Sequence, residues 1–158
     1  MPRIYTVEFE NITWTNAQGD IDAFSIDAAT DKPTAIKSIV IKATSELQEA
    51  QEEWLRIRVI RGHTTVGSGG AAATARPLSA VDTAYGGTCR TNDTTVASAG
   101  TAVNLWSDAF NVRSGYELFR APEDWFWTSG ADLIVVRLMA AVTDDTVVNG
   151  SIDIVEFP

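Results

Sequence analysis

Apolar side chains recur at every second position through much of the chain, and clusters of turn-forming residues separate these segments. Residues 5–9, 55–59, 116–118 and 152–154 each place apolar side chains two positions apart. Successive side chains of a strand point to opposite faces, so this spacing gathers the apolar residues on one face. The pattern predicts an all-β domain whose apolar residues form a core between sheets.

The same pattern predicts about eight or nine strands, which is typical of a two-sheet β-sandwich, with the jelly roll as the more specific expectation. The predicted strands cover residues 4–14, 21–27, 35–43, 54–61, 88–97, 103–112, 115–119, 133–142 and 146–157. Alternation shifts near Asn11, which predicts either a bulge or a break in the first strand. The segment 133–142 is the most apolar, so we expect a central strand buried on both faces. Asn149-Gly150 predicts either a hairpin turn or a bulge within the last segment.

Two segments interrupt this rhythm. Ser45 to Glu53 fits a short helix, because Ser45 and Gln48 have the spacing of a capping box. Residues 62–87 contain a run of glycine, serine and alanine and predict a long flexible loop, which is uncommon in a compact domain. We expect a neighbouring subunit to order this loop. Nothing resembles an interdomain linker, so residues 1–158 are expected to form a single domain.

The size, charge and cysteine content of the chain disfavour several classes of function. A chain of 158 residues buries roughly 70% of its unfolded surface, enough for a core without disulfides or metals. Twelve basic and twenty-one acidic residues give a net charge of −9, which disfavours nucleic-acid partners. No apolar run approaches the ~20 residues of a membrane-spanning helix. The start of the sequence shows no secretory signal and Cys89 is the only cysteine, so folding in a cytoplasm is expected.

Candidate chemistry is sparse. His63 is the only histidine, and with Cys89 it cannot supply the three or four ligands of a zinc site. We interpret His63 as a loop histidine with no catalytic partner. Glutamates in 46–53 are assigned to a solvated helix face and Asp144-Asp145 to a turn, although a hydrolase using Glu52 or Asp145 remains a third hypothesis. The glycine run does not fit a nucleotide-binding loop, because no helix follows it directly. We therefore predict no catalytic residues, no metal, no cofactor and no enzymatic activity.

The aromatic cluster Trp125-Phe126-Trp127 is the strongest candidate for a binding surface. Exposed tryptophans anchor protein interfaces and stack on sugar rings. Three interpretations remain open: two of the rings close one end of the sandwich, the cluster forms a protein interface, or it binds carbohydrate.

Three parts of the sequence together resemble a known family. They are MPRIYTVEF at 1–9, QEEWLRIR at 51–58 followed by RGHTT at 61–65, and AGTAV at 99–103 followed by DAFNVR at 108–113. Over most of its length the chain resembles small virion structural proteins of tailed bacteriophages and prophages. These motifs contain no catalytic signature.

The resemblance implies a capsid decoration, or cement, protein that binds and stabilises the assembled head. Its implied partners are the major capsid protein and copies of itself, as a homotrimer, and its implied location is the virion surface after assembly in the bacterial cytoplasm. The alternatives are a carbohydrate-binding β-sandwich module and a phage protein associated with the tail or a head fibre. The residues that we expect at an interface are Arg3, Tyr5, Arg76, Leu78, Trp125, Phe126 and Trp127.

Overall fold

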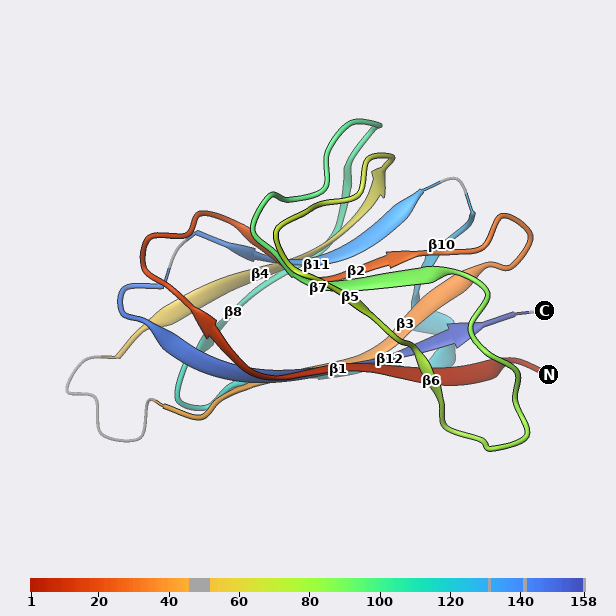
Figure 1. Ribbon diagram of the computed structural model, residues 1–158, viewed down its shortest axis with the longest axis horizontal. Helices are drawn as coiled ribbons and strands as arrows, with labels where there is room; N and C mark the ends of the chain where they lie inside the picture. Colours follow the sequence, from red (N-terminus) through yellow and green to blue (C-terminus); the bar gives the residue numbers. More distant parts are fainter. Residues whose placement is uncertain (46–51, 131, 141, 158) are drawn as a thin grey trace.

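A computed structural model describes residues 1–45, 52–130, 132–140 and 142–157. The chain is all-β, and its strands form two antiparallel sheets that face each other (Figure 1). The elements are β1 (Arg3–Trp14), β2 (Ile21–Asp27), β3 (Thr34–Ala43), β4 (Trp54–His63), β5 (Ala71–Ala73), β6 (Arg76–Pro77), β7 (Thr88–Asp93), β8 (Val103–Asn111), β9 (Tyr116–Phe119), the 3-10 helix η1 (Pro122–Asp124), β10 (Phe126–Thr128), β11 (Leu133–Met139) and β12 (Thr146–Glu156). The two-sheet sandwich predicted from the sequence is confirmed.

The strand order is that of a jelly roll. One sheet runs β10-β3-β12-β1-β6, with β9 also paired to β3, and the other runs β5-β7-β2-β11-β4-β8. Without β5, β6, β7 and β10, the orders become β1-β12-β3-β9 and β2-β11-β4-β8. The outermost pair of this eight-strand set, β1 and β12, are neighbours in the first sheet, and the next pair inward, β2 and β11, are neighbours in the second sheet, which is the nested pairing of a jelly roll. The four remaining strands extend this frame at its edges.

The core lies between the sheets and follows the alternation of the sequence. Tyr5 and Val7 of β1 and Ile152 and Ile154 of β12 are fully buried, because they lie on the inner face of the first sheet. Phe9 packs on Phe24 of the opposite sheet, with 5.1 Å between the ring centroids. β11 is central, between β2 and β4, and its residues 133–138 are buried on both faces, as predicted.

Several element predictions need correction. The described residues form twelve strands rather than eight or nine, because short strands arise in segments interpreted as loops. The predicted loop 62–87 contains β5 and β6, and the segment between the predicted strands 115–119 and 133–142 contains η1 and β10. The expected helix at 45–53 lies largely outside the described residues. The bulge near Asn11 is confirmed: the register between β1 and β12 shifts between Phe9 and Ile12, and Asn11 has a φ of 53°.

The two ends of the chain lie next to each other (Figure 1). β1 and β12 pair antiparallel along their length, with Arg3 opposite Glu156. The first and last strands therefore enter and leave the sandwich at the same end. Of the two alternatives predicted for the last segment, the structure shows the bulged strand and not the hairpin, because Asn149-Gly150 lies inside the single strand β12.

Candidate functional site

The predicted interface residues fall into two clusters at opposite edges of the first sheet. β6 forms one edge, beside β1, and β10 forms the other, beside β3. Arg3, Tyr5, Arg76 and Leu78 belong to the β6 edge, and residues 125–127 belong to the β10 edge. The structure does not bring all seven residues into one surface.

At the β6 edge, the loop 78–87 carries apolar side chains into solvent. Leu78 is 58% exposed and Val81 is 90% exposed. Arg76 is exposed and forms an ion pair with Glu8. We call Arg3, Arg76, Leu78 and Val81 the edge patch. It combines aliphatic and basic side chains on the surface of a protein with an acidic net charge.

The loop that carries the edge patch is tied to the sheet at several points. The Leu78 amide donates to the carbonyl of Ile4 at 2.9 Å. Arg3 donates to the hydroxyl of Thr83 at 2.8 Å, and the Tyr5 hydroxyl donates to the Thr83 carbonyl at 3.1 Å. These hydrogen bonds hold both the beginning and the middle of the loop against β1.

A buried carboxylate anchors the end of the same loop. Glu156 is fully buried, and its Oε1 accepts a hydrogen bond from the Gly86 amide at 2.8 Å. Its Oε2 accepts from the Tyr5 hydroxyl at 3.2 Å and lies 4.0 Å from Arg3. Burial raises the pKa of Tyr5, and the negative charge of Glu156 raises it further, so this phenol stays protonated and donates. Glu156 was not predicted from the sequence, because one glutamate at the end of a strand gives no signal of burial.

At the β10 edge, three aromatic side chains lie in a row. Trp125 and Trp127 have ring centroids 6.2 Å apart, and Trp127 lies 5.0 Å from Phe157. Both tryptophans are partly exposed: Trp127 points away from the core between the buried Phe126 and Thr128 of β10, and Trp125 precedes that strand. We call Trp125, Trp127 and Phe157 the aromatic strip.

Two of the seven predicted interface residues are core residues. Tyr5 is 0% exposed and Phe126 is 6% exposed, so neither side chain reaches a partner in this conformation. Phe126 instead contacts the guanidinium of Arg120, whose Cζ lies 4.3 Å from the ring centroid. The same guanidinium lies 5.1 Å from the ring of Trp106 in β8. Trp106 also donates a 2.9 Å hydrogen bond to the Tyr116 hydroxyl, which links β8 of one sheet to β9 of the other. Of the three aromatic residues 125–127, Phe126 is therefore a core residue, and Trp125 and Trp127 are partly exposed.

His63 was predicted to be a loop residue, and this prediction is wrong. It is the last residue of β4 and is 8% exposed, beneath two paired loops. Its Nε2 lies 3.4 Å from Nη2 of Arg137, and its Nδ1 lies 3.2 Å from the carbonyl of Ala99. Arg137 forms a buried ion pair with Asp22 at 2.6 Å. Sequence analysis missed this network, because its members are far apart in the chain.

The Asp22–Arg137 pair fixes the two loops that rise together above the second sheet in Figure 1. Asp22 accepts a hydrogen bond from the Ala97 amide at 2.6 Å, and Arg137 donates to the Ala97 carbonyl at 3.0 Å. The loops also pair with each other through bridges between Thr65 and Ser98 and between Ser68 and Thr95. The ion pair is therefore structural, with its donors and acceptors engaged in holding backbone.

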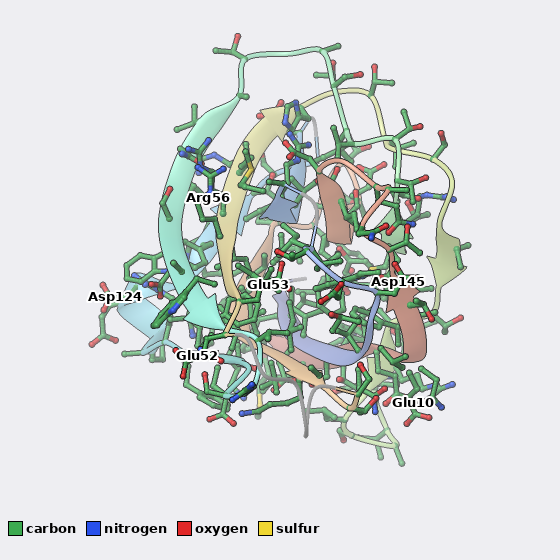
Figure 2. The ribbon with its side chains drawn as sticks, turned by 90° about the vertical axis from the view of Figure 1, so that its left-hand side faces the viewer. Glu10, Glu52, Glu53, Arg56, Asp124 and Asp145 are labelled. Carbon is green, nitrogen blue, oxygen red and sulfur yellow. The ribbon has the colours of Figure 1, made fainter. Side chains whose placement is uncertain are left out.

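The acidic residues at the opposite end of the sandwich do not converge on a site. Glu52, Glu53, Asp124 and Asp145 lie apart in the view of Figure 2. Glu53 accepts a hydrogen bond from the Thr143 amide, and Asp145 accepts from the Asn16 amide at 3.0 Å. No group of three or more histidine, cysteine or acidic side chains among the described residues has the arrangement of a metal site. The carboxylates of Glu53 and Asp145 thus hold loop backbone.

Cys89 lies at the inner side of β7 and is 4% exposed. Burial, with the nearby charge of Asp27, raises the pKa of its thiol to about 12. A protonated, buried thiol is not a nucleophile at neutral pH. None of the helices in the described parts of the chain is long and apolar enough to span a membrane.

Comparisons with known proteins give only remote neighbours. No family model matches the chain, and no curated protein matches it. Three solved structures of infectious bursal disease virus are similar at TM-scores of 0.22–0.23: the D431N mutant of the VP2 protein in T=1 particles, the Gx strain, and the T13 viral particle. Their identities are 11%, 16% and 14%, and alignment covers 99% of this chain.

These neighbours are viral capsid structures, and this chain spans only about 40% of the length of each matched chain. TM-scores this low carry no argument about function. The assignment of a jelly-roll sandwich rests on the strand order alone.

Proposed function

We propose that this protein is a structural component of a tailed-bacteriophage virion, a decoration protein that binds and stabilises the assembled head. The sequence resemblance supports the class. The edge patch is the structural observation that supports an adhesive role. It presents the exposed aliphatic side chains of Leu78 and Val81 on a loop that is hydrogen-bonded to β1 at its beginning and its middle, beside one arginine of β1 and one of β6.

A loop that is already ordered in the free protein suits adhesion, because it loses little conformational entropy when it binds a partner. Ordering a flexible segment on a partner would cost about 1–2 kcal/mol per residue in backbone entropy. Here, three hydrogen bonds to residues of β1 and β12 already restrict the loop 78–87, at its residues Leu78, Thr83 and Gly86. Leu78 and Val81 then contribute apolar area at an interface without that cost. We propose the major capsid protein as the partner, and a homotrimer as the assembled form on the shell.

Co-sedimentation with undecorated phage heads tests this proposal. We expect the wild-type protein to pellet with heads at saturation, and Leu78→Asp/Val81→Asp to lose most of this binding. Val66→Asp is the matched control, because Val66 is 47% exposed but lies on a loop of the other sheet. Analytical ultracentrifugation of each protein reports folding and oligomeric state.

Absence of wild-type protein from the pellet would reject a role on the head. Equal loss of binding by the Val66→Asp control would reject the edge patch as the contact surface. A wild-type protein that is a monomer both in solution and on heads would reject the homotrimer.

A further inference from the structure

A cavity of about 340 Å³ opens beside the aromatic strip, and the proposed role on the phage head does not use it. Arg61 of β4, Trp127 of β10 and the turn residues Ser129 and Asp132 line it, with Pro33 at its rim. Its size is at the lower end of the range for small-molecule sites. The cavity joins the ends of strands from both sheets, because β10 belongs to the first sheet and β4 to the second.

The backbone of this cavity is fixed by local hydrogen bonds. Arg61 Nη1 donates to the carbonyl of Trp127 at 2.9 Å, which holds the guanidinium over the end of β10. The Thr128 hydroxyl donates to the Asp132 carbonyl at 2.9 Å, and the Asp132 amide donates to the Ser129 carbonyl at 3.1 Å. Asp132 is therefore mounted on a constrained turn, and the guanidinium of Arg61, on β4, is held by its bond to Trp127.

Polar groups in the cavity retain unused hydrogen-bonding capacity. Within the residues that the structure describes, the Asp132 carboxylate has no hydrogen-bond or ion-pair partner, and the guanidinium of Arg61 has only the bond to Trp127. The indole Nε1 of Trp127 likewise has no acceptor there, whereas Nε1 of Trp125 donates to the Arg120 carbonyl at 3.0 Å. The cavity thus offers acceptors at Asp132, donors at Arg61, and a partly exposed aromatic ring.

We infer that this cavity is a binding site for a pyranose sugar. A sugar hydroxyl both donates and accepts, so adjacent hydroxyls satisfy a carboxylate and a guanidinium together. The apolar C–H face of the ring packs on an indole, which combines an apolar body with a polar N–H. One pyranose ring can therefore donate a hydroxyl hydrogen bond to Asp132, accept one from Arg61, and pack its C–H face on Trp127.

Other ligand classes fit this combination less well. An anion such as phosphate would face the unpaired Asp132 and a net charge of −9. A simple ammonium ligand would face Arg61. A purely apolar ligand would bury both charged groups without partners, which is costly. A neutral polyhydroxylated ring avoids each of these penalties. This inference does not depend on the proposed role on the phage head.

The test is titration of the intact protein with methyl glycosides of glucose, galactose, mannose and N-acetylglucosamine, followed by ¹H–¹⁵N NMR of the indole signals. The Trp127 signal is assigned with Trp127→Phe. At about 10 mM glycoside, which detects millimolar dissociation constants, we expect at least one sugar to shift the Trp127 indole signal. The signal of Trp14, which is 1% exposed, should not move.

Variants identify the groups that bind. Asp132→Asn and Arg61→Gln should each weaken binding about tenfold to hundredfold, the range for a lost hydrogen bond to a charged group. Trp54→Ala is the control, because Trp54 is 64% exposed at the start of β4 and does not line the cavity. Preserved indole spectra in each variant establish that the fold is intact.

Two results would overturn the inference. One is the absence of any Trp127 shift with all four glycosides. The other is binding that Asp132→Asn and Arg61→Gln leave unchanged, or that Trp54→Ala weakens equally, since either would place the sugar elsewhere. Head binding is measured separately by co-sedimentation, so failure of one proposal leaves the other intact.

Discussion

At the scale of single residues, the most consequential interactions are buried charges that hold loop backbone. Asp22 and Arg137 are 0% and 8% exposed, and each also bonds to the backbone of Ala97. A buried ion pair is costly to break, because removing one partner leaves the other charge without compensation. The same logic applies to Glu156, which holds the opposite loop region.

Arg137→Met should therefore destabilise the fold by about 3 kcal/mol, since it leaves the Asp22 carboxylate buried without its partner. The double variant Asp22→Leu/Arg137→Met should lose less than the sum of the two single variants, because both charges disappear together. Urea denaturation followed by tryptophan fluorescence measures both values. Additive losses would show that the two charges are not coupled.

Cys89 should resist thiol reagents in the native protein. Its raised pKa, about 12, means that the thiol is protonated at pH 8, and burial blocks access. We expect Ellman's reagent to react slowly in buffer at this pH and completely in denaturant. Rapid labelling in buffer would show that β7 opens readily from its place beside β2.

At the scale of elements, alternation located the long strands well, because each has one face in a single core. The ends of β1, β2, β3 and β8 lie within one residue of their predicted limits. The short strands could not be predicted this way. β5, β6 and β10 have only two or three residues each, and their pairing depends on the neighbour that the fold provides. Alanine-rich β5 even has the composition of a flexible linker.

The candidate sites were predicted less completely for a similar reason. The tryptophans were identified from sequence, since clustered aromatics stand out in a loop. Arg61 and Asp132 were missed, because only the meeting of β4 with the turn after β10 brings them to one cavity. Tyr5 and Phe126 were expected at an interface but are buried, as their alternation with more exposed neighbours indicates.

Glu156→Ala should release the loop 78–87 while leaving the sandwich folded. The Gly86 amide would lose its acceptor, and the Tyr5 hydroxyl would lose one of its two bonds. Hydrogen exchange at residues 85–87 should accelerate about tenfold or more, the equivalent of one lost hydrogen bond. Exchange in β11, far from this loop in the other sheet, serves as the internal control. Equal acceleration in both regions would indicate global destabilisation instead.

Most of the segment 62–87 is ordered by β5, β6 and the hydrogen bonds of the loop 78–87, and its most exposed point is the tip around Val81, between the bonds at Leu78 and Thr83. We expect limited proteolysis to cleave it in the free protein, first in the exposed stretch around Val81. Assembly on the shell should protect the same bonds. Mass spectrometry of the fragments locates the cuts, and equal cleavage in both states would remove this segment from the interface.

At the scale of the whole molecule, most sheet edges are short. β5 and β10 have three residues each, and β6 has two, one of them Pro77, which cannot donate a ladder hydrogen bond. β8 differs, because it is a nine-residue edge strand with largely exposed side chains and Asp108 as its only charge. The insertion of β5, β6 and β7 thus shields the edges on one side of the jelly roll and leaves β8 open on the other.

Self-association should strengthen with added salt. Each copy carries a net charge of −9, so copies repel each other at low ionic strength. Raising salt from about 0.02 to 0.5 M shortens the range of that repulsion below ~10 Å. Sedimentation velocity should then show a severalfold lower dissociation constant for the oligomer. Weaker association at high salt would instead indicate that ion pairs, such as one made by Arg76, hold the copies together.

The neighbouring ends of β1 and β12 have a practical consequence. Their backbones run side by side at Arg3 and Glu156, about 5 Å apart as in any antiparallel pair. A short linker can therefore join them without crossing the sandwich. The chain can then be reopened between Thr30 and Asp31, which are exposed between β2 and β3. Such a circular permutant would keep every strand pair and place its new ends, ready for a fused cargo, at a chosen turn.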